Sequence, residues 1–259
     1  MTSSEKRYTA VGLAVFLVVS LAVAGYWQKD RVLSFLGKGP AATNTAETAG
    51  IMREPKLPKL AKDASEDLKK LYDEAREKQK KRLNDSENYD LYLSEGLAWK
   101  SLGEYAPTGE EKRGYLQYAI FVYTQAGTKF DKEWVPWLNI GNLFKSLGDY
   151  QRAASAYQKS VETDPTQHDH YRAIVEMFKD LDIKPAPALI SFLNRNFTKM
   201  KVDMTSFVIL YAQYLLEHQM YEDALQIVRV GRDLNPFDQR LKLEYDDLEK
   251  ELKKQGLIK

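Results

Sequence analysis

The chain has no cysteine among its 259 residues, and this absence removes several kinds of chemistry. Disulfides, thiolate nucleophiles, cysteine-bound zinc and cysteine-held iron–sulfur clusters are all excluded. The 38 basic and 37 acidic residues leave a formal net charge of +1. The sequence therefore lacks the concentrated positive charge that is typical of nucleic-acid-binding proteins, and we expect no nucleic-acid partner.

The sequence also lacks the short motifs of common catalytic sites. It contains no phosphate-cradling glycine loop, no nucleophile elbow and no Walker-type lysine. His168 and His170 flank Asp169, which is a possible metal-binding set, but alternating residues do not converge readily. We therefore predict no catalytic residue, no metal, no cofactor and no small-molecule substrate. An enzyme that uses these three residues is the competing hypothesis.

One long apolar run stands at the start of the chain. Residues Tyr8 to Gln28 carry no charged side chain, and aromatic rings lie at both ends of the run. A helix of roughly 20 residues spans the apolar core of a bilayer, and aromatic rings favour its edges. After a short tail (1–8) we predict a transmembrane helix with a juxtamembrane extension (9–36), in which residues 9–27 contact the membrane.

The same start also fits a cleaved signal peptide. Lys6 and Arg7 would form its basic region, and Ala22-Val23-Ala24 resembles a small-residue cleavage site. Cleavage after Ala24 would release a secreted, soluble binding module, which is the alternative to an anchored one. The signal-like start favours a single-pass protein whose large C-terminal domain lies on the extracytoplasmic side.

The next two segments differ in composition. Residues 37–62 are rich in small, polar and proline residues without apolar periodicity, and they predict a flexible linker. Residues 63–87 return to helical spacing and predict an amphipathic helix with a charged, solvated face. Its apolar stripe consists of Leu68, Leu71, Tyr72, Ala75 and Leu83.

The rest of the chain contains repeated units, and the clearest one runs from Trp134 to Gln167. Small residues at Gly141 and Ala153 allow two antiparallel helices to approach closely, and Gly148 permits the turn between them. The pattern positions of this unit are Trp137, Ile140, Gly141, Phe144, Leu147, Gly148, Tyr150, Ala153, Tyr157 and Pro165.

Related units lie on both sides. The downstream unit, Thr205 to Asp238, has His218 and Gln219 in place of leucine and glycine, which predicts a looser turn. Its matching positions are Tyr211, Ala212, Leu215, Tyr221, Ala224, Val228, Gly231 and Pro236. An upstream unit carries an insertion, and a degraded unit lies between Pro165 and Thr205.

These units together resemble the tetratricopeptide repeat (TPR), a 34-residue helix–turn–helix unit. The resemblance implies an all-α solenoid of about four helix pairs over residues 88–238, closed by a C-terminal capping helix (239–259). It also implies a concave groove that is built from the first helix of each pair and binds peptides or helices of partner proteins.

The repeat frame gives the side chains that would line the groove. Asparagines there suit hydrogen bonds to a peptide backbone, and cations suit acidic groups. The predicted partner-binding residues are Leu97, Lys100, Leu138, Asn139, Asn142, Lys145, Arg172, Lys179 and Gln213. We expect a membrane-anchored scaffold or adaptor for protein partners, for example in the assembly of an envelope or secretion complex.

Overall fold

The computed structural model describes residues 55–185, 187–197, 199 and 204–258. Within them the chain forms ten helices and no strand, so the predicted all-α class is confirmed. None of these ten helices is long and apolar enough to cross a membrane. The predicted tail, the predicted membrane span and most of the predicted linker (1–54) lie outside the described residues.

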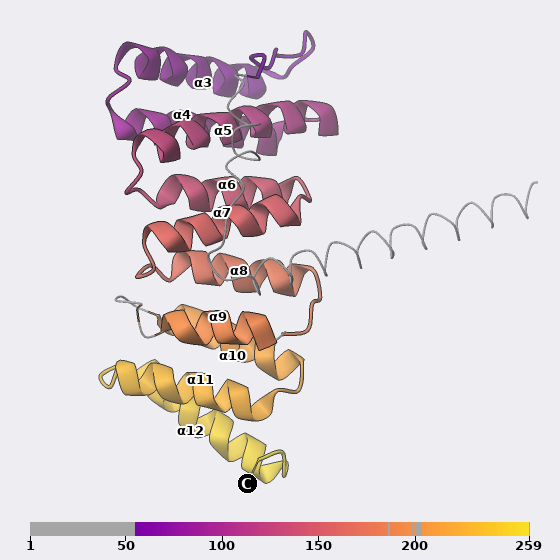
Figure 1. Cartoon of the computed structure of the whole chain (residues 1–259). Coiled ribbons are helices and arrows are strands. Elements are labelled where there is room, and N and C mark those ends of the chain that lie inside the picture. Colours follow the sequence, from indigo (N-terminus) through magenta and orange to yellow (C-terminus); the bar gives the residue numbers. More distant parts are fainter. Residues whose placement is uncertain (1–54, 186, 198, 200–203, 259) are drawn as a thin grey trace, which may run out of the picture.

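The helices follow one another through short connections and stack along one axis (Figure 1). Their bounds are α3 (Glu66–Asn84), α4 (Tyr89–Tyr105), α5 (Gly109–Lys129), α6 (Val135–Ser146), α7 (Tyr150–Thr163), α8 (Asp169–Asp180), α9 (Pro187–Phe197), α10 (Thr205–Glu217), α11 (Tyr221–Leu234) and α12 (Gln239–Lys254).

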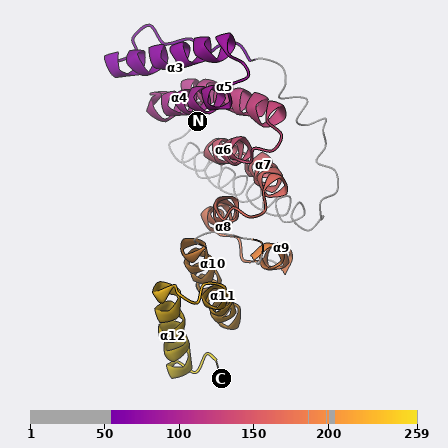
Figure 2. The ribbon, with the colours of Figure 1, turned by 90° about the vertical axis from the view of Figure 1, so that its left-hand side faces the viewer.

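Two rows of helices make up the stack. Figure 2 shows α4, α6, α8 and α10 along one side, which is the concave side of a shallow curve, and α5, α7, α9 and α11 along the other. We call α4, α6, α8 and α10 the inner row. Helix α8 packs against α6 and α10 within this row, as well as against α7. A layered stack of this kind is compatible with a helical-repeat protein.

Small residues let the paired helices approach closely. A Cβ atom added to Gly141 on α6 would lie 2.3 Å from Cε1 of Tyr157 on α7, so a larger residue there would force the tyrosine ring to move. Gly96 on α4 has the same relation to Tyr123 on α5, at 2.6 Å. The predicted close approach at Gly141 is therefore confirmed.

The turns that join the two helices of a pair are closed by the same type of backbone hydrogen bond. In the α6–α7 turn, the Asp149 N–H donates to the Phe144 carbonyl at 2.9 Å, and Gly148 adopts a φ of +74°. In the α10–α11 turn, the Met220 N–H donates to the Leu215 carbonyl, also at 2.9 Å, with Gln219 at a φ of 61°. The prediction of a looser turn was wrong, because Gln219 itself adopts the left-handed conformation that glycine usually supplies.

Helix α3 packs onto α4 with four of the five predicted stripe residues, Leu68, Leu71, Tyr72 and Ala75, buried or packed against the core, and the prediction was wrong at Leu83. Leu83 is 63% exposed, whereas Gln79 and Arg82 are buried. Positions 79 and 82 lie on the same side of the helix as Ala75. Position 83 is rotated away from that side. Arg82 can be buried because Glu95 on α4 forms an ion pair with its guanidinium.

The last residues of the predicted linker lie against the helices. We call Pro55–Lys62 the strap. The Tyr72 hydroxyl donates to the Pro58 carbonyl at 3.0 Å, and the Tyr115 hydroxyl donates to the Lys59 carbonyl at 3.4 Å. Leu57, Leu60 and Ala61 pack against the core. A proline-rich segment without helical period is thus held in place by side chains that it meets only in the folded chain.

At the other end, α12 packs on α11 and contacts α10. The Asp238 carboxylate caps its first turn by accepting from the Arg240 and Leu241 N–H groups. Leu241 and Leu252 are buried. This helix occupies the place predicted for the capping helix.

Candidate partner-binding groove

The structure places all nine predicted groove residues on the inner row. Leu97 and Lys100 lie on α4, and Gln213 lies on α10. Those on α6 are Leu138, Asn139, Asn142 and Lys145, and those on α8 are Arg172 and Lys179. The four helices lie in sequence along the concave side of the stack (Figure 2), so the predicted residues are distributed along the stack and are not gathered on one helix.

Two of the predicted lysines join successive inner helices. Lys145 Nζ on α6 lies 2.9 Å from Asp180 Oδ2 on α8. Lys179 Nζ on α8 lies 2.8 Å from Glu217 Oε1 on α10. Each lysine therefore pairs with an acid at the same end of the next inner helix. We call these two ion pairs the ladder.

The ladder was missed by the sequence reasoning, although the sequence contains a signal for it. Asp180 and Glu217 stand 35 and 38 residues after their lysines, which is about one 34-residue repeat further on. A search for opposite charges at the repeat period would have found both pairs. The lysines were predicted to contact a partner, and in the described residues they contact their own chain.

The other two predicted cations also have acidic neighbours. Lys100 Nζ lies 3.4 Å from Glu104 Oε1 on the same helix. The Arg172 guanidinium lies 3.6 Å from Asp169 and 3.8 Å from Glu176. All four predicted cations are therefore within ion-pair distance of a carboxylate. These sites offer an acidic partner little net positive charge.

The two asparagines of α6 keep part of their hydrogen-bonding capacity. The Asn142 Oδ1 accepts from the Tyr157 hydroxyl at 2.8 Å, and Asn139 Nδ2 donates to the Val135 carbonyl at 3.0 Å. Burial raises the pKa of Tyr157, so its hydroxyl stays protonated and donates. This leaves the Asn142 amide group and the Asn139 carbonyl for a partner backbone.

Apolar side chains open onto the first part of the inner row. Leu97 on α4 is 52% exposed, and Leu93 and Leu138 are half-buried. Tyr105 at the end of α4 is also exposed and was not among the predicted groove residues. Leu93 and Leu97 are four residues apart and lie on one face of α4, and Tyr105 lies about two turns further on, rotated by about 80° from Leu97. We call these three apolar side chains the apolar strip of α4.

The histidines do not form a shared site. His170 is fully buried, and its Nδ1 lies 3.2 Å from Ser160 Oγ. Because the Ser160 hydroxyl donates to the Trp134 carbonyl, Nδ1 carries the proton and donates to Ser160. His168 Nε2 instead lies 3.6 Å from Asp169. Within the described residues, no group of three or more His, Asp or Glu side chains is arranged to hold a metal ion.

The environment of His170 holds it in the neutral form. Burial lowers its pKa to about 4, and the charge of His168 acts in the same direction. The carboxylates of Asp164 and Asp169 oppose this shift but are outweighed. A neutral imidazole that packs edge-on against Trp134 and Tyr171 is part of the contact between α7 and α8. The geometry gives His170 a role in packing.

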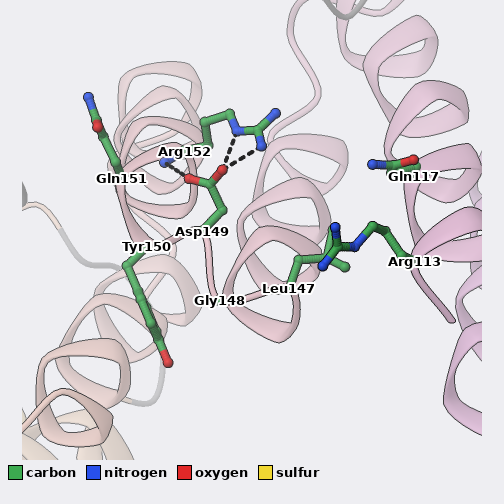
Figure 3. Close-up of a pocket in the computed structure, with 8 residues that line it drawn as sticks. All are labelled: Arg113, Gln117, Leu147, Gly148, Asp149, Tyr150, Gln151 and Arg152. Atoms are coloured by element: carbon green, nitrogen blue, oxygen red, sulfur yellow. Dashed lines mark hydrogen bonds and ion pairs between the residues drawn. The ribbon is translucent and has the colours of Figure 1, made fainter. Parts of the chain in front are cut away.

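A separate pocket lies beside the α6–α7 turn. It has a volume of about 420 Å³ and is lined by Arg113 and Gln117 of α5 and by residues 147–152. Figure 3 shows Arg113 and Gln117 facing this turn from the opposite side. Asp149 binds the guanidinium of Arg152, which also lies 4.5 Å from the centre of the Phe144 ring. None of the nine predicted groove residues lines this pocket.

Comparisons with known proteins give no family to this chain. No family model matches it, and no curated protein matches it. The resemblance to tetratricopeptide repeats therefore rests on the spacing of the residues in the sequence, and what it implies is argued below as a proposal.

Proposed function

We propose that the chain is a membrane-anchored scaffold or adaptor built from tetratricopeptide-type repeats. It binds a peptide or helix of a partner protein along the inner row. The observation that carries the proposal is the apolar strip of α4, in which Leu97 and Tyr105 are exposed and Leu93 is half-buried, on a helix that lies along the concave side of the stack (Figure 2). Apolar side chains exposed together on one face are a common feature of protein-binding surfaces.

The repeat assignment is supported by features that recur from pair to pair. A glycine lies under a tyrosine ring at Gly96 and again at Gly141, 45 residues later, where the upstream unit carries its insertion. The turns at Gly148 and Gln219 close with the same hydrogen bond. Recurring local solutions of this kind are the physical basis of a solenoid, in which each pair buries its apolar face against its neighbours.

The chemistry of the partner follows from which groups of the inner row are available. Its cations already lie beside carboxylates, and its asparagines retain part of their hydrogen-bonding capacity. The available surface near α4 and α6 is therefore apolar with a few neutral hydrogen-bonding groups. A helix with leucine-type side chains on one face suits this surface better than an acidic tail does.

Site-specific photo-crosslinking of the full chain in its native membrane tests the proposal. A photoreactive residue at position 97 should trap a partner protein, and one at Gln226, exposed on α11 of the outer row, should not. The same partner trapped equally at both positions, or none at position 97, would count against the groove.

Leu97→Glu gives a matched functional test. The side chain is half exposed, so the change should leave the fold intact while it places a charge in the apolar strip. We expect partner recovery in a pull-down to fall at least about tenfold, because burying an unpaired carboxylate in an interface is costly. Gln226→Glu is the control, and full recovery with Leu97→Glu would reject the strip as the contact.

The proposed membrane anchor is tested by two measurements on the full chain. Residues 9–27 supply the proposed span, so the chain should stay in the membrane fraction after alkaline washing, and its intact mass should include the apolar run. A mature chain that starts near Gly25 would replace the anchored scaffold with the secreted binding module.

A further inference from the structure

The strap, Pro55–Lys62, is held with one side on the domain. Two tyrosine hydroxyls, from Tyr72 on α3 and Tyr115 on α5, donate to its backbone carbonyls. Leu57, Leu60 and Ala61 face the core, and a Cβ atom added to Gly114 on α5 would lie 3.9 Å from Pro58 Cβ. The strap therefore crosses from α3 to α5 at the end of the stack, with a fixed inner side.

Its outer side carries only lysines. Lys56, Lys59 and Lys62 are all exposed, and none has an ion-pair partner among the residues that the structure describes. They are spaced by three residues, and Lys62 lies in the turn that the Ala64 N–H closes on the Ala61 carbonyl at 3.2 Å. The exposed side chains of the strap are therefore all cations, and we call this set the lysine edge.

The charges around this edge are mostly neutralised in pairs. On α3, Lys69 lies 2.7 Å from Glu66, and Lys70 lies 4.0 Å from Asp67. Asp63 follows the strap directly and is exposed.

On α5, Glu111 accepts from the Thr108 hydroxyl at the start of the helix, while Glu110 is exposed beside it. Lys112 is exposed without an ion pair in the described part of the chain, whereas Arg113 faces the α6–α7 turn (Figure 3). The start of α5 thus carries charges of both signs. The three strap lysines outnumber the neighbouring Asp63, so the strap itself is positively charged.

We propose that the lysine edge of the strap docks on anionic lipid headgroups of the membrane that holds the chain. This inference rests on the proposed anchor, which precedes the strap in the sequence and is separated from it by residues 37–54. Lysine suits a headgroup layer because it acts as a hydrated point charge and needs no shaped pocket. The anchor keeps the edge at high local concentration near the headgroups, so weak attraction per lysine is sufficient.

Docking would also orient the stack. The inner side of the strap is bound to α3 and α5, so a lipid contact at its outer side holds the α3 end of the stack at the membrane. The turn between α11 and α12, where Phe237 is 94% exposed, lies at the far end of the stack (Figure 1). The inner row would then extend away from the bilayer and stay accessible to a partner.

The absence of cysteine makes a direct test possible, because one introduced cysteine labels a single position. The full chain carrying Asp63→Cys and a fluorophore is reconstituted into vesicles of phosphatidylcholine, alone or mixed with phosphatidylserine. A headgroup-bound quencher in the lipid reports contact. We expect stronger quenching with phosphatidylserine, which added salt should reverse because it screens exposed charges. A label at Phe237→Cys should be insensitive to the lipid.

The lysines are then replaced. The variant Lys56→Gln, Lys59→Gln and Lys62→Gln should lower the docked-to-undocked ratio by on the order of a hundredfold and bring quenching down to the level seen in phosphatidylcholine. The control removes the same charge from exposed lysines in the later part of the stack, with Lys184→Gln, Lys242→Gln and Lys250→Gln, and should keep the wild-type response. Circular dichroism confirms that both variants stay helical.

Two outcomes would overturn the inference at different levels. Equal quenching with both lipids, or in the strap variant and the wild type, would reject lipid docking while the anchor stands. A wild-type chain that does not float with the vesicles would reject the anchor and the docking together.

Discussion

Replacing His170 by glutamine should remove a defined part of the acid sensitivity of the fold. The imidazole is fully buried between α7 and α8, and its Nδ1–H donates to Ser160. Glutamine can keep a hydrogen-bond donor there but does not titrate. Any pH dependence that disappears on this change therefore belongs to protonation of this one side chain.

The magnitude follows from two pKa values. The ordinary pKa of histidine is 6.5, whereas burial lowers the pKa of His170 in the folded chain to about 4. Between these values the folded state binds fewer protons than the unfolded state, so its stability falls as the pH falls. The contribution is complete above about pH 6.5. At about 1.36 kcal/mol per pKa unit, about 2 kcal/mol is lost by pH 5 and about 3 kcal/mol by pH 4.

Urea unfolding followed by circular dichroism between about pH 7 and pH 4 measures this loss. The free energy of unfolding of the wild type should fall by about 2 kcal/mol more than that of His170→Gln between pH 7 and pH 5. Buried carboxyls such as Glu95 are the same in both proteins, so the difference between the curves isolates His170. Parallel curves for wild type and His170→Gln would refute the reasoning.

Two further predictions contrast buried and exposed ion pairs by the same unfolding measurement. Arg82→Met leaves Glu95 buried without its ionic partner and should lower the free energy of unfolding by about 3–5 kcal/mol, and Arg82→Met with Glu95→Leu should recover part of it. Lys145→Ala should cost less than about 1 kcal/mol, because Lys145 and Asp180 are 24% and 53% exposed. An equal loss of unfolding free energy in Arg82→Met and Lys145→Ala would contradict the assignment of the first ion pair as buried and the second as exposed.

The local structure of the repeats could be predicted from the sequence because it depends on residues that are close along the chain. Gly141 and Tyr157 belong to neighbouring helices joined by one tight turn, so a small residue and a large one at fixed spacing define their contact. The turn at Gln219 was harder to predict. A non-glycine residue can adopt a positive φ when its surroundings require it, and residue type alone does not show this.

Charged residues were the main source of error on α3. A surface role is the usual one for arginine, so Leu83 was assigned to the buried stripe and Arg82 to the solvated face. In the structure Arg82 is buried and Leu83 is exposed, because Glu95 on α4 supplies the charge and the hydrogen bond that make burial of a guanidinium possible. Desolvation raises the pKa of Glu95, while Arg82 and Trp99 oppose that shift. Helical periodicity carries no information about such a partner.

The helices that carry the candidate groove residues could be predicted from the sequence, but the ion pairs that these residues form could not. The repeat frame placed Lys145 and Lys179 on the inner row, where they lie. Whether a lysine there is free depends on an acid one repeat away, and the sequence reasoning treated each unit alone. The strap was missed for a similar reason, since its contacts come from Tyr72 and Tyr115 on two separate helices.

Ionic strength should separate the two proposed interactions of the chain. The ladder already pairs Lys145 and Lys179 with acids of the same chain, so partner binding along the inner row would depend on Leu97 and its apolar neighbours. Apolar contacts are little weakened by moderate salt. The strap lysines are exposed and unpaired within the described residues, and attraction to lipid headgroups is screened over about 8–10 Å at physiological salt. Rising salt would therefore release the stack from the membrane surface while a partner stays bound to the inner row.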